Sequence, residues 1–297
     1  RSLSIDDVPH YEQVLKWSCL NIHLGLEALL EELTEFPSIQ FGLEQAFMSL
    51  NSEDPFLLFP SKFISGEKSI NINGLIWMGE EAFMKQQIEE KLKAGFDCIK
   101  MKIGAIDFET EIKLLWSIRK DFSSDVITLR VDANGAFTPE NALEKLKKLA
   151  ELELHSIEQP IQQGHWEEMA RLCEATPLAI ALDEELIGVF GVTEKKKLIQ
   201  TIQPQFVVLK PSLVGGFKGS QEWIDITKSQ GIPNWITSAV ESNIGLNAIS
   251  QWTYTLNTAL PQGLGTGSLY SNNIESPLEV KNGHLHYNNE LNWDFNF

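Results

Sequence analysis

Three acidic residues end three consecutive strand-like segments, and their regular spacing constrains the fold more than any other feature of the chain. Asp132 ends LRVD, Glu158 ends HSIE and Asp183 ends AIALD, at intervals of 26 and 25 residues. Intervals of this length fit one strand and one helix per unit, the pattern of a parallel α/β sheet. The sequence therefore predicts one carboxylate at the carboxyl end of each of three neighbouring strands.

Lysines occupy the corresponding position one unit before and one unit after these carboxylates. Lys100 and Lys102 alternate in IKMKIG, and Lys210 ends FVVLK. A buried strand end tolerates an ionised group only if that group is paired, hydrogen-bonded or bound to a metal. Barrel enzymes build their active sites at this end of their strands, so we expect an active site there.

The apolar segments predict an α/β fold of the modified TIM-barrel type. Helices are expected in residues 5–50, followed by a connector at 51–69 that contains two prolines and a glycine. Seven strand–helix pairs and a last short strand near Gly263 then suit a closed barrel. A doubly wound open sheet is the alternative, although it would gather ligand groups at one switch point. The expected strands lie near 72–77, 98–103, 127–132, 156–158, 178–183, 206–210 and 234–237.

The composition argues against several partners. The chain has 24 basic and 41 acidic residues, a formal charge of −17, whereas nucleic acids and anionic membranes require a basic face. Its three cysteines are far apart, which fits a reducing compartment. No long apolar run or signal-peptide pattern is present. We expect a soluble, cytoplasmic protein with no nucleic-acid or membrane partner.

Asp132, Glu158 and Asp183 have the chemistry of ligands for a hard divalent cation. Carboxylate oxygens suit Mg²⁺, with Mn²⁺ as the alternative, and no His or Cys in an equivalent position favours zinc. Any one of these residues is more simply explained as a helix cap or an exposed charge, but three in register favour a metal. Glu184 and Glu185 follow Asp183 directly, and the spacing leaves open whether either faces the site.

The lysines have the chemistry of acid–base catalysts. Strand alternation places Lys100 and Lys102 on the same face, and we expect their crowding and partial burial to lower a lysine pKa toward neutrality, as a general base requires. Two solvated lysines on an edge strand are the alternative. Lys210 approaches from the other side of the carboxylates, as a catalytic cation or as a structural partner.

Two further segments are candidate substrate contacts. The loop GLGTG, which includes Gly265 and Thr266, has backbone N–H groups suited to a substrate carboxylate or phosphate. Ser238 lies just beyond the seventh expected strand, either at the barrel mouth or as a helix cap.

The order KxK, Asp, Glu, Asp and Lys resembles the muconate-lactonizing subgroup of the enolase superfamily, from about Phe36 onward. FPSIQFGLEQA, VDANGAF, IEQPI, ALDEEL, VVLKPSLVGG, SAVESNIGLNA and GLGTGSL are most similar to the o-succinylbenzoate synthase family of menaquinone biosynthesis. The resemblance implies a (β/α)7β barrel over residues 69–270 and an α+β capping domain. Residues 1–68 would supply the rest of the cap and a connector, and residues 271–297 would return to the cap.

The resemblance also implies a reaction on a small carboxylate. Bound to Mg²⁺, 2-succinyl-6-hydroxy-2,4-cyclohexadiene-1-carboxylate would lose water in a syn elimination to give 2-succinylbenzoate. Lys102 would remove the α-proton and return it to the departing hydroxyl. The other implied roles are charge stabilisation by Lys210, adjustment of Lys102 by Lys100, support of the metal ligands by Asn134, and contacts to the succinyl group by Ser238, Gly265 and Thr266.

The same residues also suit other activities of the superfamily. Two opposed lysines also suit an N-succinylamino acid racemase or a dipeptide epimerase, although an epimerase is expected to carry an acidic motif where this chain has GLGTGSLY. A non-catalytic metal-binding barrel is another hypothesis, but such a protein would not require the two opposed lysines. Family members also have N-terminal strands and a mobile loop that closes over the substrate; we expect these to be removed or omitted before Arg1.

Overall fold

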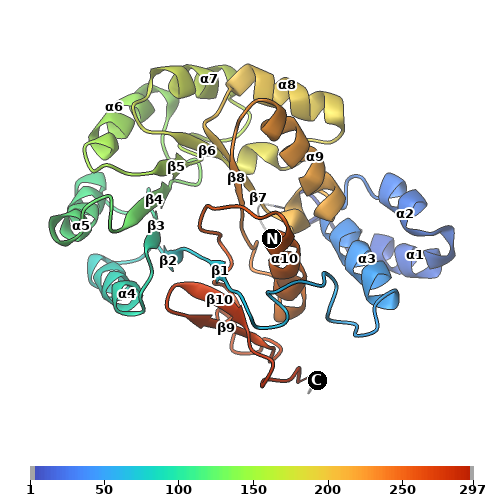
Figure 1. The fold of residues 1–297 in the computed structure, drawn as a ribbon. Helices are drawn as coiled ribbons and strands as arrows, with labels where there is room; N and C mark the ends of the chain where they lie inside the picture. Colours follow the sequence, from blue (N-terminus) through green and yellow to red (C-terminus); the bar gives the residue numbers. More distant parts are fainter. Residues whose placement is uncertain (1–3, 295–297) are drawn as a thin grey trace.

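The computed structural model describes residues 4–294, and its centre is a seven-stranded parallel sheet that curls on itself (Figure 1). The strands follow chain order, each hydrogen-bonded to the next. This arrangement confirms the predicted α/β barrel class. The strands are β2 (Gly74–Ile76), β3 (Cys98–Lys102), β4 (Thr128–Asp132), β5 (Ser156–Glu158), β6 (Ile180–Leu182), β7 (Phe206–Leu209) and β8 (Asn234–Ile236).

A two-residue segment joins the two edges of this sheet. The amide of Gly263 donates to the Ile236 carbonyl at 2.8 Å, and the amide of Asn73 donates to the Gln262 carbonyl at 2.9 Å. The last strand predicted near Gly263 is therefore reduced to isolated bridges. Pro261 precedes them and has no amide N–H with which to extend the ladder.

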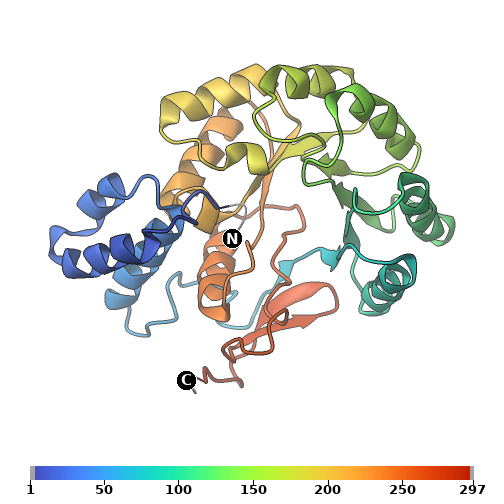
Figure 2. The same ribbon diagram turned by 180° about the vertical axis from the view of Figure 1, so that it is seen from behind.

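Helices cover the outer face of the sheet (Figure 2). Local signals in the sequence explain several of their ends: α6 begins with a Thr138–Asn141 capping box and Pro139 in its first turn, while Gly95 follows α4 with a φ of +77°, where glycine is favoured. The helices are α4 (Glu81–Lys93), α5 (Phe108–Asp121), α6 (Pro139–Ala150), α7 (Trp166–Ala175), α8 (Val192–Ile202), α9 (Gly216–Ser229) and α10 (Asn243–Thr255), with the short 3₁₀ turns η2 (Glu184–Leu186) and η3 (Pro211–Leu213).

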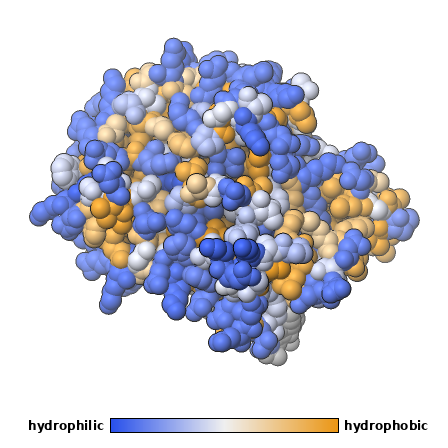
Figure 3. All heavy atoms as spheres, in the orientation of Figure 1, coloured by the Kyte–Doolittle hydropathy of each residue, from blue (hydrophilic) through white to orange (hydrophobic). Residues whose placement is uncertain are grey.

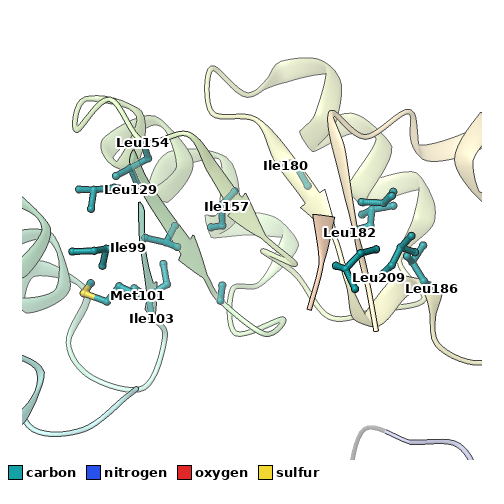
Figure 4. Close-up of a cluster of buried hydrophobic side chains, with 14 of the residues drawn as sticks. Ile99, Met101, Ile103, Leu129, Leu154, Ile157, Ile180, Leu182, Leu186 and Leu209 are labelled. Carbon is teal, nitrogen blue, oxygen red and sulfur yellow. The ribbon is translucent and has the colours of Figure 1, made fainter. Parts of the chain in front are cut away.

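Alternation along the strands separates the core from the site. Ile99, Met101 and Leu129 are fully buried and contribute to the hydrophobic core (Figure 4). The alternate residues of these strands, which include Lys100 on β3 and Asp132 at the end of β4, therefore point to the opposite face, toward the barrel axis. The apolar side chains of each strand pack against the helices, and the polar side chains on the other face form the site.

Three N-terminal helices flank the barrel beside α9. They are α1 (Tyr11–Leu20), α2 (Leu26–Glu32) and α3 (Pro37–Leu50), with the 3₁₀ turn η1 (Ile22–Leu24) after α1. Leu29, Leu33, Ile39 and Leu43 form a small core of their own. The ring of Phe41 on α3 meets that of Phe217 on α9 with centroids 5.4 Å apart, which fixes these helices to the barrel wall.

The C-terminal hairpin returns to the start of the barrel. Strands β9 (Leu278–Lys281) and β10 (His284–Tyr287) form an antiparallel sheet with β1 (Ile70–Asn71). The turn residues Asn282 and Gly283 both have positive φ, as a tight hairpin turn requires. Further along, Trp293 stacks on Phe56 with ring centroids 4.5 Å apart, so the end of the described chain contacts the connector after α3.

The visible surface is mainly hydrophilic (Figure 3), in keeping with the charge of −17. The exposed apolar side chains include Leu20 on α1 and Leu24 in η1. Among residues 4–294, no helix combines the length and the apolarity needed to cross a membrane.

Candidate active site

Asp132, Glu158 and Asp183 meet at the carboxyl end of the sheet. Asp132 and Glu158 are paired in register as the last residues of β4 and β5, and Asp183 follows β6. One carboxylate oxygen from each lies within 4.8 Å of the others, and all three side chains are buried. This carboxylate trio, as we call it below, could hold a metal ion.

Three lysines contact the trio from both sides. Lys100 Nζ lies 2.6 Å from Glu158 Oε2 and 2.9 Å from Asp132 Oδ2, and Lys102 Nζ lies 2.6 Å from the same Asp132 oxygen. Lys210, directly after β7, forms an ion pair with Asp183. The sequence predicted that these lysines would approach from opposite sides; the contacts with individual carboxylates appear only in the structure.

The ion pairs determine the charges in the site. Burial by itself lowers the pKa of Lys100, but the carboxylates of Asp132 and Glu158 outweigh burial and raise it. The pKa of Lys210 is raised in the same way, chiefly by Asp183. The prediction that crowding lowers the lysine pKa is therefore wrong for Lys100, because this ammonium group forms ion pairs with both Asp132 and Glu158.

The carboxylates respond unequally to the same surroundings. Burial favours the protonated form of Asp132, yet Lys100 and Lys102 outweigh it and hold its pKa well below the ordinary value. Burial and then the charge of Asp132 raise the pKa of Glu158, despite its contact with Lys100. Glu158 lies between two other carboxylates, so it is the member of the trio that most needs additional positive charge.

The trio fits a hard divalent cation. Glu158 Oε1 is buried without a hydrogen-bond partner among residues 4–294, and an orphaned buried carboxylate oxygen is a natural metal ligand. Three carboxylates supply the all-oxygen donor set that such cations prefer.

Asn134 and Glu184 extend the site from the trio. Asn134 Oδ1 accepts a hydrogen bond from Lys102 at 2.7 Å, and Asn134 Nδ2 donates to Glu184 Oε1 at 2.8 Å. Glu185 points elsewhere and accepts from Gln159 and the amide of Gly164. The sequence left open which of the two glutamates faces the site; Glu184 does.

A cavity of about 600 Å³ opens over the lysines. Its lining includes Lys100, Lys102 and Lys210, the predicted contacts Ser238, Gly265 and Thr266, and also Asn134, Trp77, Tyr270 and Glu241. The structure thus brings these predicted residues to one space.

Sequence reasoning missed Glu241. Its carboxylate accepts hydrogen bonds from Ser212 and, at 2.6 Å, from Ser238. The preceding residue, Val240, has a φ of +69°, which is unusual for a β-branched side chain. Only its position between Ser238 and Ser242 in SAVES marked Glu241 in the sequence.

The curled parallel sheet and the lysine-flanked carboxylate trio define a class of metal-dependent barrel enzymes, and comparisons with known proteins give the same class. Residues 83–290 match the family model described as enolase C-terminal domain-like. Over 250 residues the chain is 54% identical to the o-succinylbenzoate synthase of Desulfotalea psychrophila. The matched residues make up 84% of this chain and 68% of that protein.

A solved structure and a second relative extend this similarity. The crystal structure of MenC from Desulfotalea psychrophila matches with a TM-score of 0.80 and 47% identity, over 93% of this chain and 80% of that one. An N-succinylamino acid racemase of Thermus thermophilus is 30% identical over 66% of this chain and 51% of its own length. The chain belongs to the o-succinylbenzoate synthase family of the enolase superfamily.

Proposed function

We propose that this protein is an o-succinylbenzoate synthase that removes water from 2-succinyl-6-hydroxy-2,4-cyclohexadiene-1-carboxylate to give 2-succinylbenzoate. The observation that carries the proposal is the position of Lys102, which lines the cavity and lies 2.6 Å from Asp132 of the trio. A proton-transferring group thus lies beside the place where a substrate carboxylate would be held. The 54% identity to a curated synthase supports this choice of reaction.

Lys102 acts first as base and then as acid. Its neutral amine takes the proton from the ring carbon that bears the carboxylate, and the resulting ammonium gives that proton to the departing hydroxyl. The ring becomes aromatic, one molecule of water leaves, and Lys102 returns to its starting form. One residue on one face of the ring accounts for a syn elimination.

The trio would hold Mg²⁺, or alternatively Mn²⁺, through Asp132, Glu158 and Asp183. Such a cation supplies positive charge for the carboxylate of the substrate. Lys210 and Lys100, both buried beside the trio, add fixed positive charge in a site that excludes much of the surrounding water, where electrostatic stabilisation is strongest.

The loop after the last bridge contacts the succinyl group. Ser238 donates its hydroxyl proton to Glu241 and accepts from Thr266 Oγ1 at 2.9 Å and from the amide of Val240 at 3.0 Å. Its oxygen is thereby saturated, and it acts by shaping the wall. The amides of Gly265 and Thr266 donate to no backbone carbonyl among residues 4–294, so they are the donors for the succinyl carboxylate.

The test measures the absorbance change on mixing protein, Mg²⁺ and the cyclohexadiene. We expect turnover that EDTA abolishes and that Lys102→Ala reduces at least about 10³-fold. Lys148→Ala, which removes a surface lysine paired with Glu109, is the matched control and should turn over normally. Normal turnover by a folded Lys102→Ala protein would exclude the proposed base.

Racemisation of N-succinylamino acids is the second candidate, because Lys102 and Lys210 contact different members of the trio. A dipeptide epimerase, which is expected to carry an acidic motif at the site, has less support. Glu241 is an acidic residue of the cavity lining, but both of its oxygens accept hydrogen bonds from serine hydroxyls. Solvent-deuterium incorporation into N-succinylamino acids, compared with dehydration of the cyclohexadiene, separates the two activities. A much faster exchange reaction would make racemisation the main activity.

A further inference from the structure

The ammonium group of Lys102 has two fixed neighbours in addition to the cavity that it lines. It donates to Asp132 Oδ2 at 2.6 Å and to Asn134 Oδ1 at 2.7 Å. An ammonium group has three N–H bonds in a staggered arrangement, so two acceptors fix its rotation. The third direction is the one left for the cavity.

The amide of Asn134 can have only one orientation. Its oxygen faces an ammonium group, which is donor only, and its nitrogen faces the Glu184 carboxylate at 2.8 Å, which is acceptor only when ionised. Flipping the amide would set donor against donor and acceptor against acceptor. Glu184 is 3% exposed, and its second oxygen has no partner among the described residues.

The backbone turn after β4 places the Asn134 side chain between Lys102 and Glu184. The backbone N–H of Asn134 donates to Asp132 Oδ1 at 3.0 Å. Asn134 adopts a φ of +43°, in the left-handed region that asparagine tolerates. Gly135 follows with a φ of +75°, and its amide donates to the Gln159 carbonyl at 2.7 Å. The backbone thus folds the Asn134 side chain back toward Lys102.

We propose that Asn134 and Glu184 are positioning residues that aim Lys102 at the substrate. When Lys102 is neutral, its two N–H bonds point to Asp132 and Asn134, and its lone pair points into the cavity to receive the proton. When Lys102 is charged, the third N–H bond points the same way and delivers that proton. The same pair of acceptors serves both half-reactions, so one lysine works as base and acid without rotating.

This inference rests on the proposed role of Lys102, and substitutions that exchange donors and acceptors test it. Asn134→Leu keeps the approximate shape but removes the acceptor, and we expect kcat to fall about 10–100-fold with KM changed less than about threefold. Asn134→Asp alone sets two carboxylates against each other. In the double variant Asn134→Asp with Glu184→Gln, the carboxylate at position 134 accepts from Lys102 and also from the side-chain amide at position 184. We therefore expect kcat to recover at least tenfold over Asn134→Asp.

Glu222→Gln is the matched control, because Glu222 accepts from the buried lysine Lys195 in the helical layer and does not line the cavity over Lys102. It should keep wild-type kcat. Full kcat in Asn134→Leu, or a double variant no faster than Asn134→Asp, would overturn the inference. Rescue is the outcome that a purely structural role for Asn134 would not produce.

Crystal structures separate failure of this inference from failure of the proposed function. In wild type we expect Lys102 Nζ within hydrogen-bond distance of Asn134, and in Asn134→Leu we expect Lys102 in more than one position. If wild type does not dehydrate the cyclohexadiene, the proposed reaction fails. The position of Lys102 in the two crystal structures still tests whether Asn134 and Glu184 hold this lysine in place. A single unchanged Lys102 position in Asn134→Leu would refute it.

Discussion

Glu44 joins the N-terminal helices to the barrel through a buried carboxylate, and its protonation is expected to control stability. From α3 it accepts hydrogen bonds from the amides of Phe217 and, at 2.9 Å, of Lys218 in the first turn of α9. Burial raises the pKa of Glu44 from 4.5 to about 7, although the two amides partly oppose this. Glu44 is 6% exposed, so solvent screens the effect little.

The sign and size of the pH dependence follow from this difference. Folded Glu44 holds its proton to a higher pH than unfolded Glu44, so its stabilising contribution is complete below about pH 4.5 and is lost as the pH rises through about 7. At about 1.4 kcal/mol per pH unit of pKa difference, the free energy of unfolding should fall by about 2–3 kcal/mol between pH 5 and pH 8 because of Glu44 alone.

Urea unfolding at both pH values tests this for wild type and Glu44→Gln. Glutamine does not titrate, so the variant should lose about 2–3 kcal/mol of the pH dependence, while losing about 1 kcal/mol at pH 5 because its single carbonyl oxygen replaces two acceptors. Glu27→Gln is the control, since Glu27 pairs with the same Lys218 but is 81% exposed. An unchanged pH dependence in Glu44→Gln would refute the reasoning.

Three further substitutions have direct readouts. Gly104→Ala should lower the free energy of unfolding by more than about 2 kcal/mol in urea, because Gly104 has a φ of +94° and a Cβ would lie 2.4 Å from that of Ala136; wild-type stability would contradict this. Thr138→Ala should cost about 1 kcal/mol by losing its capping box, and an unaltered melting temperature would count against it. Asp183→Asn should weaken Mg²⁺ binding at least about tenfold by calorimetry, and equal affinity would remove Asp183 from the ligand set.

Strand and helix spacing allowed much of the site to be predicted. Periodic burial and near-constant unit length fix which residues end each strand, because side-chain direction alternates along a strand and parallel strands align their carboxyl ends. That logic brought Asp132, Glu158 and Asp183 to one edge with lysines on either side. The roles of these residues in catalysis stay predictions.

The sequence by itself determined the strand order, the barrel class and the kinds of charge at its mouth, since these depend on short-range patterns. Only the tertiary structure decided that Asp132 pairs with both Lys100 and Lys102, that the closing strand shrinks to bridges at 262–263, and that Asn134 donates a hydrogen bond to Glu184. These features depend on side-chain conformations and barrel curvature, which bring together groups tens of residues apart. A raised rather than lowered pKa for Lys100 has the same origin, because the sign depends on the distance to a carboxylate on another strand.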